Sequence, residues 1–530
     1  MRIVWLLPLL CCLGCFQGPP LTLLAENAQP LKLGQMTVLG RLTGSPHVVE
    51  TVPRGQHFIT QVANQGNKPI SLRLEGAHPE TVSLEPHRWT RIRGRLTSDR
   101  LAFHWQGSEL RFGGIYLEAP SKKPNVLLVS IDTLRADYFT PEHMPATYAL
   151  MSQGTIFTKT YTTAPWTLPA HASMLTSQYP ARHGVRQPNQ AIPEEAVTLA
   201  EVFRDNGYYT LALTEGNYVS ATYGFDQGFH EYQENPPSIL DQNVDTISKL
   251  ESSLAAITAQ LEALEGVPRF AFFHTYEVHC PYVPRGDLKD ERGLGLTQWL
   301  LESDGKPLDP NDLEQLKALY GGEVAWLDQR LAAFLEKLLA DGDWMVVLTA
   351  DHGEEFGEHG GLLHADTVYQ ETAHIPFAMA GVQIPNGQDG RIASLVDVPA
   401  TLLGRFGFNT PHSWEGRDLF GPHQEPELAF SESFYFGSQI QAVDPRVVGV
   451  WRATDKLIQT RNFGKIRAEL YNLETDPGET NNQQANQQLR RDALFLFLES
   501  YLSNKPLDGR LIDGLSEEQI ETMRSLGYIK

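Results

Sequence analysis

Two patterns of hydrophobic and polar positions divide the chain. Between about residues 25 and 118, short runs alternate between apolar and polar side chains, as in 57–60, 70–74 and 101–105, with Gly, Pro and Asn between them. Alternation with a period of two is typical of strands with one buried face, so this part predicts a small antiparallel β-sandwich. Its aromatic residues could line a partner or carbohydrate surface, but we expect them to fill the core: Trp89, Phe103, Trp105 and Tyr116.

From Asn125 onward the pattern predicts an α/β domain. Continuous apolar runs at 126–129 and 344–348 indicate strands buried on both faces of a mostly parallel sheet. A capping box at 198–201 begins a helix, and residues 313–339 predict one or two amphipathic helices. The fold class expected is therefore α/β, with helices on both sides of the sheet.

The last hundred residues predict a smaller α+β subdomain. Runs at 457–460 and 469–473 indicate strands, and a helix is expected over 486–503. The expected order of parts is a leader, a β-rich accessory domain, a main α/β domain and this subdomain, at 1–15, 25–118, 123–430 and 431–530.

The leader has the form of a signal peptide. Arg2 precedes a run over 3–13 that is apolar apart from Pro8, too short to span a bilayer as a helix. Cys15 follows Gly as in the cleavage site of a bacterial lipoprotein, although Cys12 stands where an aliphatic residue is usual. We expect export to the bacterial periplasm or cell envelope, with membrane contact only through a lipid on Cys15.

Composition narrows the possible partners. The chain has 530 residues and a net charge of −21, which argues against nucleic acid as a partner because phosphates attract basic surfaces. An anionic small molecule would need a bound cation to reverse the local field. Beyond Cys15 only Cys280 remains, so no internal disulfide framework is expected.

Two carboxylates follow buried strands directly. Asp132 comes after 126–131, and Asp351 comes after 345–348 and is followed by His352 and a glycine. Ligands in doubly wound sheets lie beyond the carboxyl ends of strands, so these side chains are candidate metal ligands. A lone Asp-His-Gly is also common in turns, and the second strand-end aspartate is what strengthens the interpretation.

Thr167 is a candidate nucleophile at the start of a helix. Pro169 suits the first helical turn, which places the Thr167 hydroxyl where backbone N–H groups attract an anionic oxygen. The plainer interpretation is that Thr167 is only a helix N-cap.

Several motifs together resemble the sulfatase branch of the alkaline phosphatase superfamily. They occur in the order and spacing of that branch at 125–137, 167–176, 179–185, 351–353, 469–479 and 526–528. The resemblance covers roughly residues 123 to 530 and implies the α/β fold of that superfamily. The β-domain before it is not covered.

The chain departs from true sulfatases at the nucleophile. Sulfatases carry Cys-x-Pro-Ser-Arg, whose cysteine becomes formylglycine, whereas this chain has Thr167 and, in place of the arginine, His171. The Gly-Lys-Trp-His segment of many sulfatases appears here as 215–218, without a lysine, and their adjacent aspartates are reduced to Asp132. The pattern is instead similar to the threonine-nucleophile branch, which includes phosphoethanolamine and phosphoglycerol transferases.

That resemblance implies one metal ion, held by Asp132, Thr167, Asp351 and His352. A histidine beside carboxylates suits Zn²⁺ or Mn²⁺ better than Ca²⁺, which prefers oxygen ligands. A second metal would need a pair such as Asp226 and His230, but that segment looks structural in relatives, so a single metal is expected.

The resemblance also implies residues that bind substrate. His279 and His364 match a substrate-binding pair, either of which would protonate the leaving oxygen, and His171 and Asn189 complete the expected set. Pro188 disturbs the register at Asn189. We expect the acidic stretch Glu354 to His359 to form a solvated loop or to support the ligands.

The sequence thus predicts an exported, metal-dependent hydrolase that cleaves phosphate-type esters of small molecules, glycans or lipids through a covalent Thr167 intermediate. Three alternatives remain. One is a transferase that delivers the group to an envelope glycan or lipid, the second is a sulfuric ester hydrolase, and the third is a non-catalytic binding lipoprotein.

Overall fold

The computed structural model describes residues 31–512, apart from short gaps and three longer ones at 237–248, 286–294 and 297–308. The lipoprotein-type leader with Cys15 lies outside the described residues and stays a prediction. The chain divides into two compact units. One contains Leu39–Ser121 with Arg204–Tyr208, and the other contains Leu31–Val38, Lys122–Phe203 and the chain from Tyr209 onward.

The first unit contains two antiparallel sheets. One has the order β4 (His47–Glu50), β10 (Arg100–His104), β6 (Ile70–Glu75) and β8 (Thr81–Leu84), and the other β3 (Gly40–Leu42), β11 (Leu110–Glu118), β5 (His57–Asn64), β9 (Trp89–Leu96) and β7 (Ala77–His78).

Aromatic side chains fill the core of this unit, as expected. Phe103 packs edge-on against Phe112 with ring centroids 4.8 Å apart, and Trp105 and Tyr116 are buried. Trp89 is half-buried.

The second unit is built on one mixed sheet of eight strands. Its order is β16 (Glu231–Glu234), β15 (Tyr209–Thr214), β17 (Arg269–Thr275), β12 (Asn125–Ile131), β18 (Trp344–Ala350), β21 (His374–Gly381), β13 (Thr155–Tyr161) and β22 (Gly387–Ser394). The first five strands are parallel, and β21 is antiparallel to both of its neighbours. Every residue of β12 and β18 is buried, which follows from their continuous apolar sequences.

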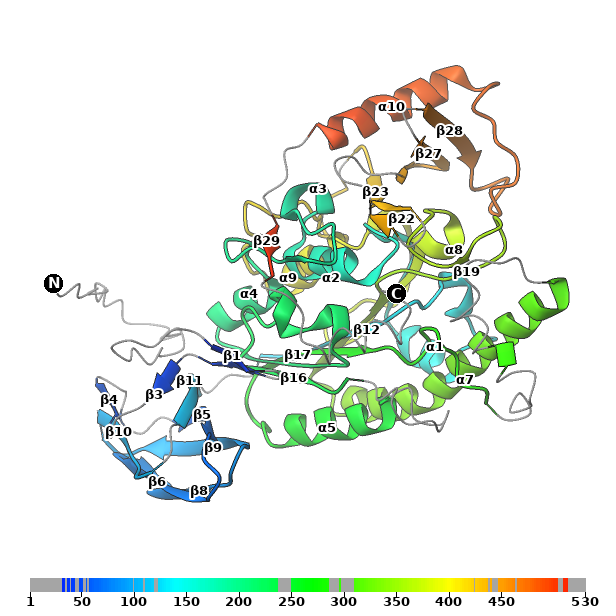
Figure 1. Ribbon diagram of the computed structural model, residues 1–530. Helices are drawn as coiled ribbons and strands as arrows, with labels where there is room; N and C mark the ends of the chain where they lie inside the picture. The colour runs from blue at the N-terminus through cyan, green and yellow to red at the C-terminus, as the bar shows by residue number, and fades with distance from the viewer. Residues whose placement is uncertain are drawn as a thin grey trace. The chain divides into compact units, whose positions relative to one another are not determined.

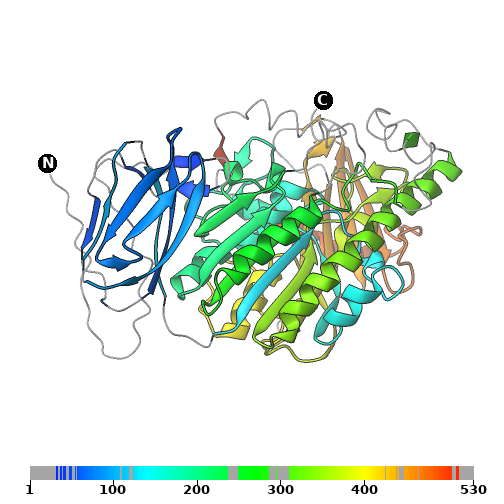
Figure 2. The same ribbon diagram turned by 90° about the horizontal axis from the view of Figure 1, so that it is seen from below.

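Helices cover both faces of this sheet and confirm the α/β fold class (Figures 1 and 2). On one face lie α1 (Pro145–Met151), α5 (Leu250–Glu262) and α7 (Pro310–Ala340); on the other lie α2 (Thr167–Thr176), α4 (Leu199–Asp205) and α9 (Asp397–Phe406). The segment predicted as one or two helices is the single helix α7.

The predicted capping box begins α4. The Glu201 amide donates to Thr198 Oγ1 at 3.2 Å, and the Thr198 amide donates to Glu201 Oε2 at 3.0 Å. Two N–H groups that a helix start leaves without partners are thereby satisfied.

A four-stranded antiparallel sheet follows, in the order β23 (Leu428–Ser433), β26 (Val447–Arg452), β27 (Asp455–Asn462) and β28 (Lys465–Asn472). Leu494 and Leu498 of α10 (Gln488–Leu502) are buried in one cluster with Val448 and Val450. This is the α+β subdomain of the expected fold class. Among the described helices, none combines the length and apolar character that a bilayer crossing requires.

Candidate metal and nucleophile site

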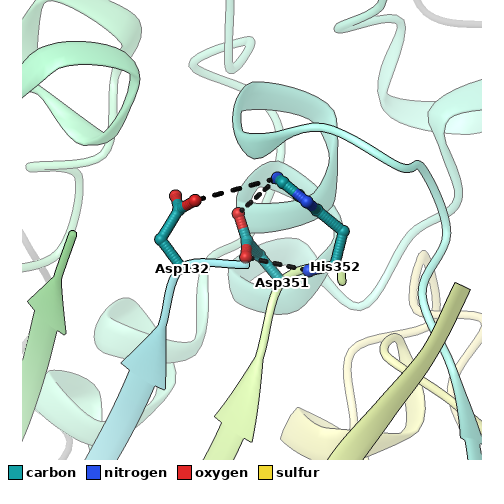
Figure 3. A group of neighbouring side chains, drawn as sticks. All are labelled: Asp132, Asp351 and His352. Atoms are coloured by element: carbon teal, nitrogen blue, oxygen red, sulfur yellow. Dashed lines mark hydrogen bonds and ion pairs between the residues drawn. The ribbon is translucent and has the colours of Figure 1, made fainter. Parts of the chain in front are cut away.

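Two adjacent strands bring Asp132 and Asp351 together. In the parallel pair β12 and β18, Ile131 lies opposite Ala350, so the next residue of each strand leaves the sheet at the same edge. Both aspartates are fully buried, and Figure 3 shows their carboxylates turned toward the ring of His352. The structure therefore brings the three candidate metal ligands together at this edge of the sheet.

The three side chains can offer one ligand atom each, all within 4.8 Å of one another. His352 Nε2 lies 3.3 Å from Asp351 Oδ2 and 3.9 Å from Asp132 Oδ1. The other ring nitrogen of His352 donates to the Gly353 carbonyl at 2.9 Å, which leaves the lone pair of Nε2 directed at the carboxylates.

The donor set fits a divalent cation. Three of its buried atoms have no hydrogen-bond partner in the described part of the chain: Asp132 Oδ1, Asp351 Oδ2 and His352 Nε2. Buried polar atoms are rarely left without a partner, because each costs about 1–3 kcal/mol. A cation among them would satisfy all three at once.

Burial and mutual repulsion set the charges of this group. Burial raises the pKa of Asp132 to about 7, and burial together with the Asp132 carboxylate raises the pKa of Asp351 well above its usual range. Burial also lowers the pKa of His352, which keeps the ring neutral. A bound cation would favour the ionised form of both carboxyl groups, and the neutral imidazole can offer its lone pair to the cation.

Thr167 is the first residue of α2, and its hydroxyl points into this group. Thr167 Oγ1 donates to Asp132 Oδ2 at 3.2 Å and is fully buried. The N-cap is Trp166, whose backbone is extended and whose side chain makes no capping hydrogen bond. Thr167 therefore does not occupy the N-cap position, and the plainer interpretation does not account for its hydroxyl.

His171 lies one helical turn after Thr167 and is also fully buried. Its Nδ1 donates to the Thr167 carbonyl at 2.9 Å, and its Nε2 lies 3.0 Å from Ser130 Oγ. Burial holds the pKa of His171 well below its usual value, so the ring is neutral. Both nitrogens of this predicted substrate-binding residue are thus engaged by protein atoms, which ties the start of α2 to β12.

His279 and His364 come together beside His352. The ring centroids of His279 and His364 are 5.1 Å apart, and those of His364 and His352 are 4.4 Å apart. His279 is buried in the loop after β17, and the His364 side chain is 8% exposed. The sequence-predicted pair thus borders the three candidate metal ligands.

Glu354 takes up one of the two positions expected for it. It was expected in a solvated loop or in support of the ligands, and it is fully buried, with Oε1 2.8 Å from His364 Nδ1 and Oε2 accepting from the Tyr282 hydroxyl at 2.9 Å. Burial alone would lower the pKa of His364, but the Glu354 carboxylate raises it above the ordinary value. The Glu354 carboxylate therefore favours the protonated form of His364.

His274 was missed entirely. It lies in the strand β17, is fully buried, and places Nε2 3.6 Å from Asp132 Oδ2. Burial lowers the pKa of His274 to about 3, so its ring is neutral. Within a continuous apolar run a single histidine resembles a core residue, so no local pattern singles out His274.

Asn189 lies apart from the buried group. It is exposed in the turn before β14 (Gln190–Ala191), and its backbone carbonyl accepts from the amide of Ile512 at 3.1 Å. No contact in the described part of the chain joins it to the aspartates.

Of the pair considered for a second metal, His230 accepts at Nδ1 from the Thr210 amide at 3.1 Å, which supports strand packing.

Sulfatases and a sulfotransferase are among the proteins with similar sequences, and a phosphonate monoester hydrolase is among the solved structures with a similar fold. Arylsulfatase K of Xenopus laevis is 20% identical over an alignment covering 69% of this chain and 80% of the relative. The low-salt glycan biosynthesis sulfotransferase Agl7 of Haloferax volcanii is 27% identical, over 57% of this chain and 66% of the relative. The phosphonate monoester hydrolase of Silicibacter pomeroyi shares the fold, with a TM-score of 0.58 at 20% identity over 72% of this chain and 96% of that chain.

The model of the family described as Sulfatase matches residues 124–408, more than half of the chain. This span holds Asp132, Thr167, His279, Asp351 and His364 and the sheet that positions them. The chain therefore belongs to the sulfatase family, within the alkaline phosphatase/sulfatase superfamily of hydrolases.

Proposed function

We propose that this protein is a metal-dependent hydrolase of phosphate-type esters that works through a covalent intermediate on Thr167. The observation that carries the proposal is the buried hydrogen bond from the Thr167 hydroxyl to Asp132, 3.2 Å long, beside a carboxylate and a neutral imidazole. A hydroxyl placed against candidate metal ligands is what a nucleophile of this kind requires.

Asp132, Asp351, His352 and Thr167 would hold the cation. The imidazole among oxygen ligands favours Zn²⁺ or Mn²⁺ over Ca²⁺. When bound, a divalent cation lowers the pKa of a neighbouring hydroxyl and shields the charge of an incoming anion.

Different residues of the chain would then carry out the bond-forming and proton-transfer steps. Thr167 Oγ forms a bond to phosphorus while the bond from phosphorus to the leaving oxygen breaks, and the hydroxyl proton moves toward Asp132, which already accepts it. His364, whose pKa is raised by the Glu354 carboxylate, or His279 beside it gives a proton to the leaving oxygen. In the second half, water attacks phosphorus and passes a proton to that histidine, while the bond from phosphorus to Thr167 Oγ breaks. Thr167 Oγ takes its proton back from Asp132.

The nature of the nucleophile favours phosphorus over sulfur. A threonine cannot become the formylglycine that sulfatases use, and His171, in place of their arginine, has both nitrogens engaged within the protein. The names of the relatives favour two other candidates, sulfuric ester hydrolysis and group transfer to a glycan. A lipid on Cys15 would keep any of these activities at the cell envelope.

A substrate panel with defined metals tests the proposal. The full chain, stripped of metal and reloaded with Zn²⁺ or Mn²⁺, should hydrolyse a phosphomonoester, phosphodiester or phosphonate faster than the matching sulfate ester. Asp351→Ala should lose both the metal and the activity, whereas Asp389→Ala, which removes a carboxylate on β22, should keep both. Faster sulfate release, or activity that survives in Asp351→Ala, would contradict it.

A further inference from the structure

His274 is a buried histidine that nothing in the proposed reaction uses. Its side chain is fully buried, and neither ring nitrogen has a hydrogen-bond partner in the described part of the chain. An imidazole left this way costs about 1–3 kcal/mol for each unsatisfied polar atom. An apolar residue could fill the same space without this cost. A histidine here is therefore expected to have a hydrogen-bond partner.

The register of the sheet directs this ring at Asp132. In the parallel pair β17 and β12, His274 lies opposite Ser130, and Ser130 comes two residues before Asp132 in the chain. The Asp132 amide donates to the carbonyl of Thr275, the residue after His274, at 3.0 Å. The two backbones are therefore fixed against each other, and His274 Nε2 comes to lie 3.6 Å from Asp132 Oδ2.

The two oxygens of Asp132 have different surroundings. Oδ1 faces His352 Nε2 at 3.9 Å, on the side of the candidate cation, whereas Oδ2 accepts from Thr167 Oγ1 and faces His274. The other neighbours of His274 are the rings of His171 and Tyr276, with centroids 4.9 and 4.6 Å away in edge-to-face packing. These rings fix the plane of the imidazole and leave its Nε2 edge toward the carboxylate.

We propose that His274 is a positioning residue whose Nε2–H donates to Asp132 Oδ2, so that Asp132 presents Oδ1 to the cation. A closing movement of a few tenths of an ångström brings the pair within hydrogen-bond distance. Carboxylate ligands of metals are usually held by such a second hydrogen bond, and its loss weakens metal binding about 10- to 100-fold.

The contact has a second consequence for the nucleophile. Thr167 and His274 face the same oxygen of Asp132, so the carboxylate keeps a donor when the threonine hydroxyl gives up its proton and turns to the substrate. After the proton has moved to Asp132, the hydrogen bond from His274 would still hold that carboxyl group in place. This step rests on the proposed function, whereas the effect on metal affinity does not require a substrate.

The test compares two variants of similar size in the full chain. His274→Gln keeps an N–H donor and should bind Zn²⁺ within about threefold of wild type, and His274→Met removes the donor and should bind about 10- to 100-fold more weakly. His183→Met is the matched control, because His183 is also fully buried but contacts Ser173 and the Val185 amide. It should lose stability without losing Zn²⁺ affinity, measured by competition with a chelator.

Each other outcome is decisive. Wild-type affinity in His274→Met, or equal loss in His274→Gln and His274→Met, overturns the positioning role. Complete loss of metal in His274→Met, as expected for Asp351→Ala, would make His274 a ligand itself and also overturns it. No Zn²⁺ or Mn²⁺ bound by the wild type would overturn this proposal and the proposed function together.

The wild type provides a measurement that does not depend on how the variants fold. In a ¹⁵N-labelled, metal-loaded protein, the His274 ring, assigned by comparison with His274→Gln, should carry its proton on Nε2. A ring protonated on Nδ1, or one without a proton on Nε2 because it binds the metal, would refute the assignment.

Discussion

At the scale of single residues, burial decides which ionisable side chains of the central sheet are charged. Glu215, directly after β15, is fully buried and accepts from the Tyr276 amide at 2.7 Å and from Ser253 Oγ at 3.2 Å. Burial raises the pKa of this carboxyl to about 8. Below that pH the residue is a neutral acid, although the sequence would count it as a charge.

Replacing Glu215 by glutamine should change how stability depends on pH. The carboxyl keeps its proton up to about pH 8 when folded but loses it near pH 4.5 when unfolded, so wild-type stability declines as pH rises between these values. Glu215→Gln removes this decline, since its amide still accepts from Tyr276 and donates to Ser253. The advantage of the variant in free energy of unfolding should grow with pH to about 4 kcal/mol.

Denaturant unfolding at pH 5 and pH 8.5 checks the Glu215 prediction. Glu314→Gln is the control, because that carboxylate is 76% exposed, and its effect should be the same at both pH values. A constant difference between Glu215→Gln and wild type would refute the raised pKa.

At the scale of elements, one buried ion pair joins the C-terminal sheet to the central one. Lys456 on β27 and Glu479 after β28 are fully buried, with Nζ 2.6 Å from Oε1. The other oxygen of Glu479 accepts from the amide of Gln370, the first residue of α8 (Gln370–Ala373), which leads directly into β21. The motif at 469–479, which resembles the family, therefore helps to hold the C-terminal sheet against the central one.

Breaking this pair from one side should destabilise the protein strongly. Lys456→Met leaves the Glu479 carboxylate buried without its cation and should cost about 3–5 kcal/mol of unfolding free energy. The double variant Lys456→Met with Glu479→Gln should recover most of that loss, because the amide still accepts from Gln370. Equilibrium unfolding of the single and double variants decides the matter, and a double variant no more stable than Lys456→Met would show that the pair is not the cause.

Helices and strands could be predicted where a local sequence pattern determines them. Of the candidate site, only the residues that directly follow parallel strands could be predicted in this way. Asp132 and Asp351 were found because buried strands precede both, and parallel neighbours end at one edge of a sheet. His274 was missed because its role depends on the register between β17 and β12, which no local pattern encodes. For Glu354 the sequence left exposure and burial open, because an acidic stretch is usually exposed, whereas the fold buries it against His364.

At the scale of the whole molecule, an acidic protein that binds an anion would need its positive groups concentrated at the binding site. The net charge of −21 repels anionic esters, so attraction has to come from the site. The cation proposed between Asp132 and Asp351 would supply it, together with His364, whose pKa is raised by the Glu354 carboxylate. This role would explain why two buried carboxylates, unfavourable side by side, occur where β12 and β18 end.

The most direct measurement of the central claim is kcat/KM of Thr167→Ala on the best ester of the panel. If Thr167 attacks phosphorus, the variant should fold and bind metal but lose several orders of magnitude in rate, roughly 10³-fold or more, since its Oγ forms the new bond. Thr167→Ser should keep part of the activity because a hydroxyl remains. Thr176→Ala is the matched control, a buried threonine at the other end of α2 whose hydroxyl bonds the Ala172 carbonyl, and it should keep the wild-type rate. Activity of Thr167→Ala within about tenfold of wild type would contradict the account.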